Sequence, residues 1–279
     1  MRPNAIGIAW WYLRISGLLV IALVLGHLFV MHYANAPKAT TSAFVLTRWS
    51  AGFWRDFDWA LLLLALTHGL LGMRNVVADT VPSLIGRRVS EGILAILAAA
   101  FLAMGTISIV NVTHGLQTRG ILSDAFWIVP TLDALLGALA VVTYLALAAL
   151  IVLFVARAVL KLPIGWWQFS GQWAWALHRA TGIGIFFFLI VHVLDLALVP
   201  LAPNLYDATV ASYANPFLMP MEIALVCAVI YHALNGVRLW ILEFFDQETS
   251  DAATGTFACV LVVTLVLVLP SIFVLVRGS

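Results

Sequence analysis

The stretch HRATGIGIFFFLIVH, residues 178–192, decides the fold, because an arginine, a Thr-Gly pair and a histidine share one long apolar run. The stretch RISGLLVIALVLGH, residues 14–27, has the same arrangement about 165 residues earlier. In both stretches the histidine follows the arginine by thirteen residues. An internal repeat therefore organises the chain.

The repeat continues in HGLLGMRNVVAD, residues 68–79, and HALNGVRLWILE, residues 232–243. Both segments have the pattern H-x3-G-x-R-x4-[D/E], 41 and 40 residues after the earlier histidine. The first copy contains Arg14, Ser16, Gly17, His27, His68, Gly72, Arg74 and Asp79, and the second contains Arg179, Thr181, Gly182, His192, His232, Gly236, Arg238 and Glu243.

The composition is that of a membrane protein. Hydrophobic residues make up 63% of the chain and charged residues 10%, whereas soluble domains carry about 25% charged residues. The net charge of +1 implies no nucleic-acid partner. The two cysteines, Cys227 and Cys259, lie in apolar runs, so the chain alone cannot hold a Cys-ligated iron–sulfur cluster.

We predict an all-α membrane protein with seven transmembrane helices, since a crossing helix needs about 20 apolar residues. The expected spans are 8–32, 54–78, 91–112, 131–157, 178–200, 219–243 and 256–276. Each copy uses three spans, and 131–157 has no counterpart, so it returns the chain to the starting side. The organisation is a first three-helix repeat (1–113), an interfacial loop and linker helix (114–165), and a parallel second repeat (166–279). Nine basic residues against five favour a cytoplasmic N-terminus.

The four repeat-matched histidines are the candidate cofactor ligands. Two opposed imidazoles can ligate one haem iron from both sides, and we expect His68 to pair with His232 and His27 with His192. At 1.5 Å per residue, His68 and His232 lie about 9 Å from Arg74 and Arg238 along their helices. His27 and His192 lie about 20 Å from Arg14 and Arg179. The two haems would therefore be offset by roughly 10 Å in depth. The alternative is that each imidazole packs against a carbonyl group, but intramembrane ionisable residues are usually functional.

Small residues beside the ligands would give a flat macrocycle room; these are Gly26, Gly69, Gly72 and Gly236. The same small-x3-small spacing also occurs in ordinary helix packing. The histidines outside the repeat, His32 and His114, are interpreted as interfacial.

Charged residues at the span ends are further candidates. Arg14, His178 and Arg179 could bind haem propionates or a quinone carbonyl, or the arginines could reach the headgroups instead. The quinone or proton candidates are Arg179, Asp79, Asp58 and Glu222, because a carboxyl group can exchange the protons of quinone chemistry. The alternatives are an acid that complements the helix dipole for Asp58 and Glu222, and a solvated helix end for Asp79.

The second copy, from H178-R-x-T-G to H232-x3-G-x-R-x4-E, resembles the larger cytochrome b anchor of succinate dehydrogenases and fumarate reductases, and the first copy resembles the smaller anchor. The chain looks like both anchors fused. The resemblance implies that His68 and His232 hold the haem of single-haem members, and that His27 and His192 add a second haem b. Two-haem members are often associated with menaquinone. Thr80 and Trp175 depart from the residues of ubiquinone-reducing members.

The resemblance also implies a multisubunit enzyme complex in a prokaryotic cytoplasmic membrane. A flavoprotein subunit oxidises succinate, an iron–sulfur subunit docks on the cytoplasmic loops, and the haems relay electrons to quinone; fumarate reduction is the reverse. The complex could form a higher oligomer. Three alternatives remain: a dihaem anchor of another dehydrogenase, such as a formate dehydrogenase or hydrogenase; a haem-free transporter; and a haem-free structural anchor.

Overall fold

The computed structural model describes residues 5–35, 39–111, 170–212, 219–245 and 250–278, and this part of the chain contains helices and no strand. The helices are α1 (Ala5–Leu28), the π-helix η1 (Phe29–Tyr33), α2 (Ser42–Ser50), α3 (Gly52–Thr80), α4 (Leu84–Asn111), α6 (Ser170–Leu201), α7 (Pro203–Ser212), α8 (Met219–Phe244) and α9 (Ser250–Gly278).

Six of these segments are long and apolar enough to cross a membrane: Gly7–Tyr33, Gly52–Thr80, Leu84–Val110, Gly171–Leu201, Pro220–Phe244 and Ala252–Phe273. The predicted all-α membrane fold is confirmed. The fourth predicted span, 131–157, and the predicted interfacial loop, 114–130, lie outside the described residues, so the count of seven spans stays a prediction.

Several helices are longer than the sequence prediction. The helix α6 begins at Ser170 rather than 178, α4 at Leu84 rather than 91, and α9 at Ser250 rather than 256. The prediction followed the apolar stretch, whereas a helix continues into the interfacial region, where long side chains reach water. The short helices α2 and α7 lie between predicted spans, where no helix was predicted. In α2, the Thr41 side chain accepts a hydrogen bond from the Phe44 N–H, which caps the first turn.

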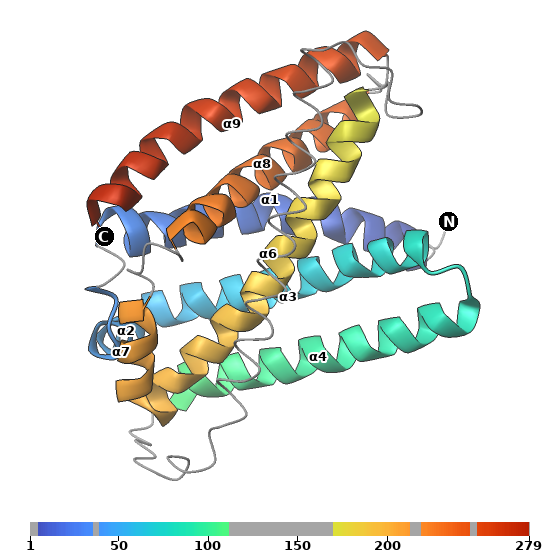
Figure 1. Ribbon diagram of the computed structural model, residues 1–279. Coiled ribbons are helices and arrows are strands. Elements are labelled where there is room, and N and C mark those ends of the chain that lie inside the picture. The colour runs from blue at the N-terminus through green and yellow to red at the C-terminus, as the bar shows by residue number, and fades with distance from the viewer. Residues whose placement is uncertain (1–4, 36–38, 112–169, 213–218, 246–249, 279) are drawn as a thin grey trace.

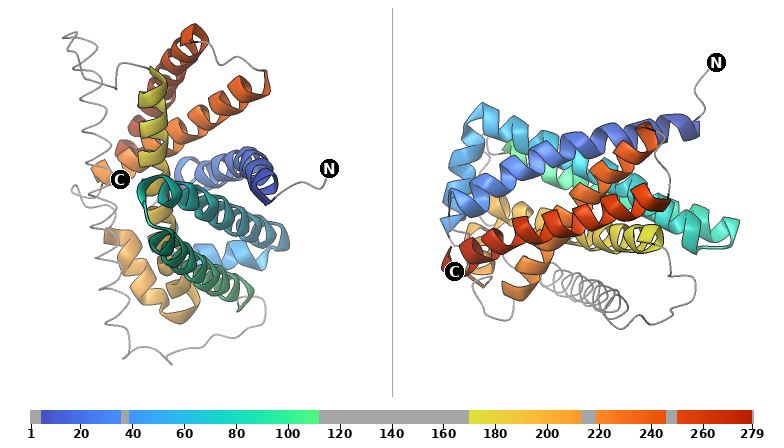
Figure 2. Two further views of the ribbon diagram at one scale, coloured as in Figure 1. Left: turned by 90° about the vertical axis from the view of Figure 1, so that its right-hand side faces the viewer. Right: turned by 90° about the horizontal axis from the view of Figure 1, so that it is seen from above.

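The two copies of the repeat, α1-α3-α4 and α6-α8-α9, lie side by side, and α1 and α6 run in the same direction (Figures 1 and 2). Within the copies, α3 contacts α1 and α4, and α8 contacts α6 and α9; between them, α1 contacts α8 and α3 contacts α6. The helices α1, α3, α6 and α8 thus form a central four-helix bundle. We call the end where α1 and α6 begin the arginine end, and the end with α2 and α7 the cap end.

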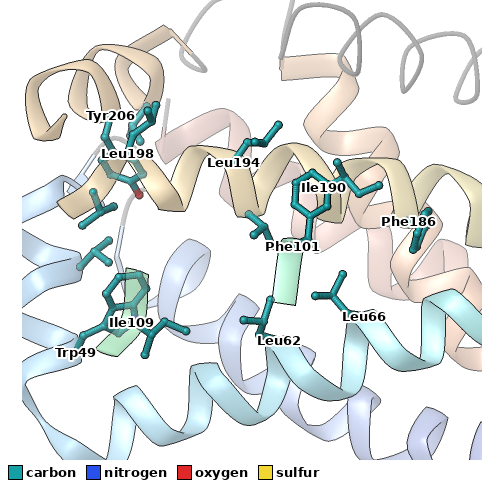
Figure 3. Close-up of a cluster of buried hydrophobic side chains, with 14 residues drawn as sticks. Trp49, Leu62, Leu66, Phe101, Ile109, Phe186, Ile190, Leu194, Leu198 and Tyr206 are labelled. Carbon is teal, nitrogen blue, oxygen red and sulfur yellow. The ribbon is translucent and has the colours of Figure 1, made fainter. Parts of the chain in front are cut away.

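The helix α6 runs through the largest apolar cluster (Figure 3). Its side chains Phe186, Ile190 and Leu194 pack with Leu66 of α3 and Phe101 of α4. This cluster joins the second copy to the first, so the two copies share one core.

The cap end is closed by hydrogen bonds between equivalent segments of the two copies. Asp207 of α7 accepts from the Ser42 N–H at 2.6 Å and from the Ser42 hydroxyl at 3.0 Å. The Tyr206 hydroxyl donates to the Thr40 carbonyl. Burial, followed by the charges of Asp195 and Asp207, raises the pKa of Tyr206 to about 12. Tyr206 is therefore a hydrogen-bond donor rather than an acid at neutral pH.

Candidate functional site

A cavity of about 920 Å³ lies within the central four-helix bundle and is lined by side chains from both copies. It is at the upper end of the range of about 300–1,000 Å³ typical of ligand pockets. Most of the predicted site residues line it: His27, His68, His178, His192, His232, Arg14, Arg179, Asp58 and Glu222, with Gly17, Gly69, Gly72, Gly182 and Gly236.

The histidines nearer the arginine end, His68 and His232, are held by hydroxyl groups. His68 Nδ1 lies 3.0 Å from Ser16 Oγ, and His232 Nδ1 lies 3.2 Å from Thr181 Oγ1 and 3.1 Å from the His178 carbonyl oxygen. For His232 the carbonyl partner can only accept, so its Nδ1 atom is the donor. The neutral ring of His232 with its hydrogen on Nδ1 keeps the Nε2 lone pair available to bind a metal.

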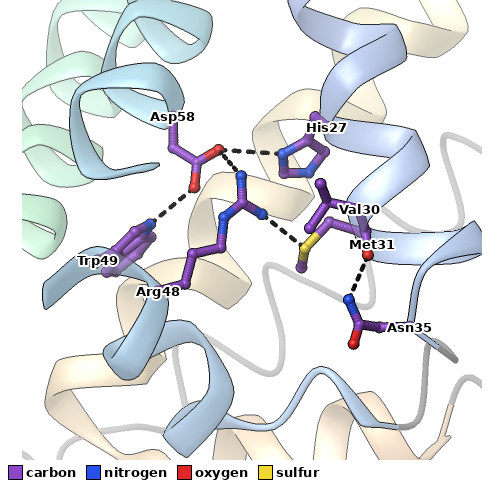
Figure 4. Close-up of polar contacts among 7 residues, drawn as sticks. All are labelled: His27, Val30, Met31, Asn35, Arg48, Trp49 and Asp58. Atoms are coloured by element: carbon purple, nitrogen blue, oxygen red, sulfur yellow. Dashed lines mark hydrogen bonds and ion pairs between the residues drawn. The ribbon is translucent and has the colours of Figure 1, made fainter. Parts of the chain in front are cut away.

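His27 and His192, nearer the cap end, form an adjacent pair. Their ring centroids are 6.0 Å apart with an interplanar angle of 82°. His27 Nδ1 lies 3.3 Å from Asp58 Oδ1, so a carboxyl group of α3 holds this ring (Figure 4). His192 stacks on Phe188 at 5.4 Å.

The histidines are too few and too scattered in the described ranges for a site made by protein ligands alone. In the described ranges no group of three or more His, Cys, Asp or Glu side chains could hold a metal ion, whereas haem iron needs only two axial ligands from the protein. The two cap-end rings lie next to each other in the same cavity, with centroids 6.0 Å apart.

Two equivalent glycines allow the ring edges of the histidines at the arginine end to approach the neighbouring helix closely. A Cβ atom on Gly17 would lie 3.2 Å from His68 Cε1, and one on Gly182 would lie 2.9 Å from His232 Cε1. Gly26 and Gly69 allow close helix packing, because a Cβ on Gly26 would lie 3.2 Å from Phe57 and one on Gly69 would lie 2.8 Å from Phe186.

His178 stacks on the face of His232, with ring centroids 3.9 Å apart and an interplanar angle of 7°. Its buried Nδ1 atom has no hydrogen-bond partner among the described residues. An unsatisfied buried polar atom costs free energy, and this one belongs to a side chain that lines the cavity. A ligand that reaches the arginine end could supply the missing partner.

At the arginine end, each repeat arginine binds the acid that ends the second helix of the other copy. Arg14 of α1 donates from Nε to Glu243 Oε2 at 2.9 Å and from Nη2 to Oε1 at 2.5 Å. Arg179 of α6 pairs with Asp79 of α3 and lies 4.0 Å above the ring of Trp175. These crossed pairs replace two interpretations made from the sequence. Arg14 binds a carboxylate of the other copy instead of reaching the headgroups, and Asp79 pairs with Arg179 instead of ending its helix in solvent alone.

We expect the crossed pair to stabilise the fold more than an exposed pair. The Arg14 and Glu243 side chains are 23% and 27% exposed, whereas those of the Arg74–Glu91 pair are 52% and 35% exposed. A double-mutant cycle with Arg14→Gln and Glu243→Gln, followed by chemical unfolding in detergent, should give a coupling energy of about 1–2 kcal/mol. The control cycle at Arg74 and Glu91 should give less than about 1 kcal/mol. Equal couplings would contradict the expectation.

The carboxyl groups near the cap end have specific partners. Asp58 Oδ1 accepts from Arg48 Nη2 at 2.9 Å, and Asp58 Oδ2 accepts from Trp49 Nε1 at 3.0 Å (Figure 4). Glu222 Oε1 lies 3.3 Å from His32 Nδ1. His32 was interpreted as interfacial, but it lines the cavity and pairs with the second copy. His114 lies outside the described residues.

Sequence reasoning missed two charged residues of the cavity wall, Arg48 and Asp195. Asp195 is 7% exposed and follows His192 by three positions, so it belongs to the same helix face. That spacing could have identified it. Arg48 lies on α2, a helix that the apolar pattern did not predict, and no sequence signal distinguished it from a solvated loop arginine.

Comparison with known proteins gives one family match. Residues 1–109 and 156–269 match the family described as succinate dehydrogenase/fumarate reductase transmembrane subunit. The succinate dehydrogenase 2 membrane subunit SdhC of Mycobacterium tuberculosis is 47% identical over 77 residues, which are 28% of this chain and 57% of that protein.

A second relative matches over more of its own length. The succinate dehydrogenase hydrophobic membrane anchor subunit of Halobacterium salinarum is 28% identical over 116 residues, which are 41% of this chain and 88% of that protein. The match to the Mycobacterium tuberculosis subunit spans less than two thirds of that protein's length. No solved structure matches the chain.

Proposed function

Because the chain belongs to the succinate dehydrogenase/fumarate reductase transmembrane subunit family, we propose that it is the dihaem cytochrome b anchor of a succinate:quinone oxidoreductase. The observation that carries the proposal is the histidine-lined cavity between the copies. Three of the four repeat histidines have their Nδ1 atoms 3.0–3.3 Å from polar atoms of the cavity wall, which leaves Nε2 as the atom for axial ligation.

His68 and His232 are the proposed ligands of one haem b, and His27 and His192 of the other. Haem bound in this way supplies one-electron transfer. The chain positions the proposed ligands. The side chains of Ser16, Thr181 and Asp58 hold three of the four rings at their Nδ1 atoms.

The arginine end is the proposed place for propionate or quinone binding. His178 carries an unpartnered buried nitrogen, and Arg179 lines the cavity beside Asp79 and Trp175. Asp79 could exchange a quinone proton there, whereas Glu222 and Asp58 could do so near the cap end. Menaquinone is the proposed quinone, since Thr80 and Trp175 depart from the ubiquinone pattern.

The proposed partners are a flavoprotein subunit that carries out succinate oxidation and an iron–sulfur subunit that passes electrons to this chain. The excess of basic residues favours a cytoplasmic N-terminus, and the arginine end would then face the docking subunits. The complex would link the tricarboxylic acid cycle to the respiratory chain.

We expect a reduced-minus-oxidised spectrum of the purified complex to show b-type haem at about two per chain, quantified as the pyridine haemochrome. A value near one would remove one histidine pair from the proposal, and a colourless protein would contradict haem binding and favour a transporter or a structural anchor. Copurification of a flavoprotein that oxidises succinate would separate this complex from a formate dehydrogenase or hydrogenase.

A further inference from the structure

We propose that Arg48 binds a carboxylate of the cofactor held by His27 and His192, which in the dihaem protein is a haem propionate. This inference rests on the proposed function. Arg48 lies on α2, outside the membrane-spanning helices, yet its side chain is 6% exposed and lines the cavity. A cation in such a place needs an anion to offset its lost hydration.

The hydrogen bonds of Arg48 leave room for a second anion. A guanidinium has five N–H donors. In the structure, Nη2 donates to Asp58, Nη1 donates to the Met31 sulfur at 2.9 Å, and the buried Nε atom has no partner among the described residues (Figure 4). A thioether sulfur is a weak acceptor, so an entering carboxylate could replace Met31 at Nη1 with a stronger bond.

The charge of Asp58 is shared. Its carboxylate accepts hydrogen bonds from Arg48 and Trp49 and also holds His27. Because a bidentate arginine–carboxylate pair needs two donors aimed at one carboxylate, and Asp58 receives one from Arg48, the guanidinium retains donors for another acid. Burial lowers the pKa of Arg48, and the charge of Asp58 opposes that shift. Arg48 would thus gain from a further anion.

The position of Arg48 selects the cap-end cofactor. Asp58 Oδ1 contacts both Arg48 Nη2 at 2.9 Å and His27 Nδ1 at 3.3 Å. The guanidinium therefore lies one carboxylate away from the imidazole of a proposed axial ligand. The other pair, His68 and His232, is held at its Nδ1 atoms by Ser16 and Thr181 and shares no partner with Arg48.

The test compares Arg48→Gln with Arg55→Gln in the purified complex. Arg55 is also near the cap end, but its pair with Asp56 is exposed, with side chains 32% and 70% exposed. Redox titration should show that Arg48→Gln lowers the midpoint potential of one haem by about 59 mV. For a one-electron couple, this corresponds to a roughly tenfold smaller equilibrium constant for reduction. The other haem, and both haems of Arg55→Gln, should be unchanged.

A spectroscopic readout separates binding from a purely structural role. Resonance Raman spectra should show a shifted propionate-bending band for the affected haem in Arg48→Gln. If this variant does not assemble, Arg48→Lys, which keeps the charge but loses the planar fork, should retain both haems and still shift that band. If an Arg48 variant with two haems keeps the propionate bands or the midpoint potentials of the wild-type protein, the proposed role of Arg48 is overturned and the proposed function is not. A wild-type protein without haem would instead overturn the proposed function.

Discussion

Replacing His192 with Leu should leave about one haem per chain instead of two, and should slow succinate-driven quinone reduction. Leucine has a similar volume but no lone pair, so the cap-end site would lose one of its two axial ligands. Losing only an outer hydrogen-bond partner of a metal ligand costs roughly 10- to 100-fold in affinity, and loss of the ligand itself should cost more. The measurement is haem per chain, with the redox titration of the haem that remains.

The equivalent change in the other pair, His232→Leu, should remove the arginine-end haem and leave the cap-end haem, so the two variants should retain haems of different midpoint potential. His32→Leu is the matched control, because His32 lines the same cavity but lies outside the repeat. It should keep both haems. Retention of two haems by His192→Leu, or loss of haem from His32→Leu, would contradict the ligand assignment.

Replacing Gly182 with Val should remove or displace the arginine-end haem. Even a Cβ at this position would lie 2.9 Å from His232 Cε1 and 3.4 Å from Nδ1. The ring must then move, which breaks its bond to Thr181 and turns the Nε2 lone pair. Overpacking of this kind costs roughly 1–3 kcal/mol, and we expect haem per chain to fall from two toward one.

Gly92→Val provides the control for Gly182→Val, because Gly92 lies on α4 with nothing within 4 Å of an added Cβ. It should retain both haems. Gly17→Ala should give an intermediate result, since its added carbon would lie 3.2 Å from His68 Cε1. A protein with Gly182→Val and an unchanged spectrum would argue against His232 as a ligand in the orientation described here.

The sequence predicted the helices and the candidate ligands because both depend on local patterns. Long apolar runs identify spans without any tertiary information. The repeat then singled out His27, His68, His192 and His232 from seven histidines, and all four line one cavity. The family resemblance, which used the same motifs, is confirmed by the match over both copies.

The sequence could not predict side-chain partners that depend on how the copies pack. Arg14 and Glu243 are 229 positions apart, and no motif joins them. The same holds for Arg48, whose helix α2 is too short and too polar to be recognised from its apolar pattern. A lone arginine between two spans has the composition of a solvated loop, and only the closure of the cap end buries it.

The crossed ion pairs also limit how such chains can recombine. Arg14 meets Glu243 and Arg179 meets Asp79, so each half carries one member of both pairs. A chimaera that joins the first half of one homologue to the second half of another combines ion-pair members from two different proteins. Any charge reversal at one of these positions needs its compensating change in the opposite half, so the halves must be exchanged together or evolve in concert.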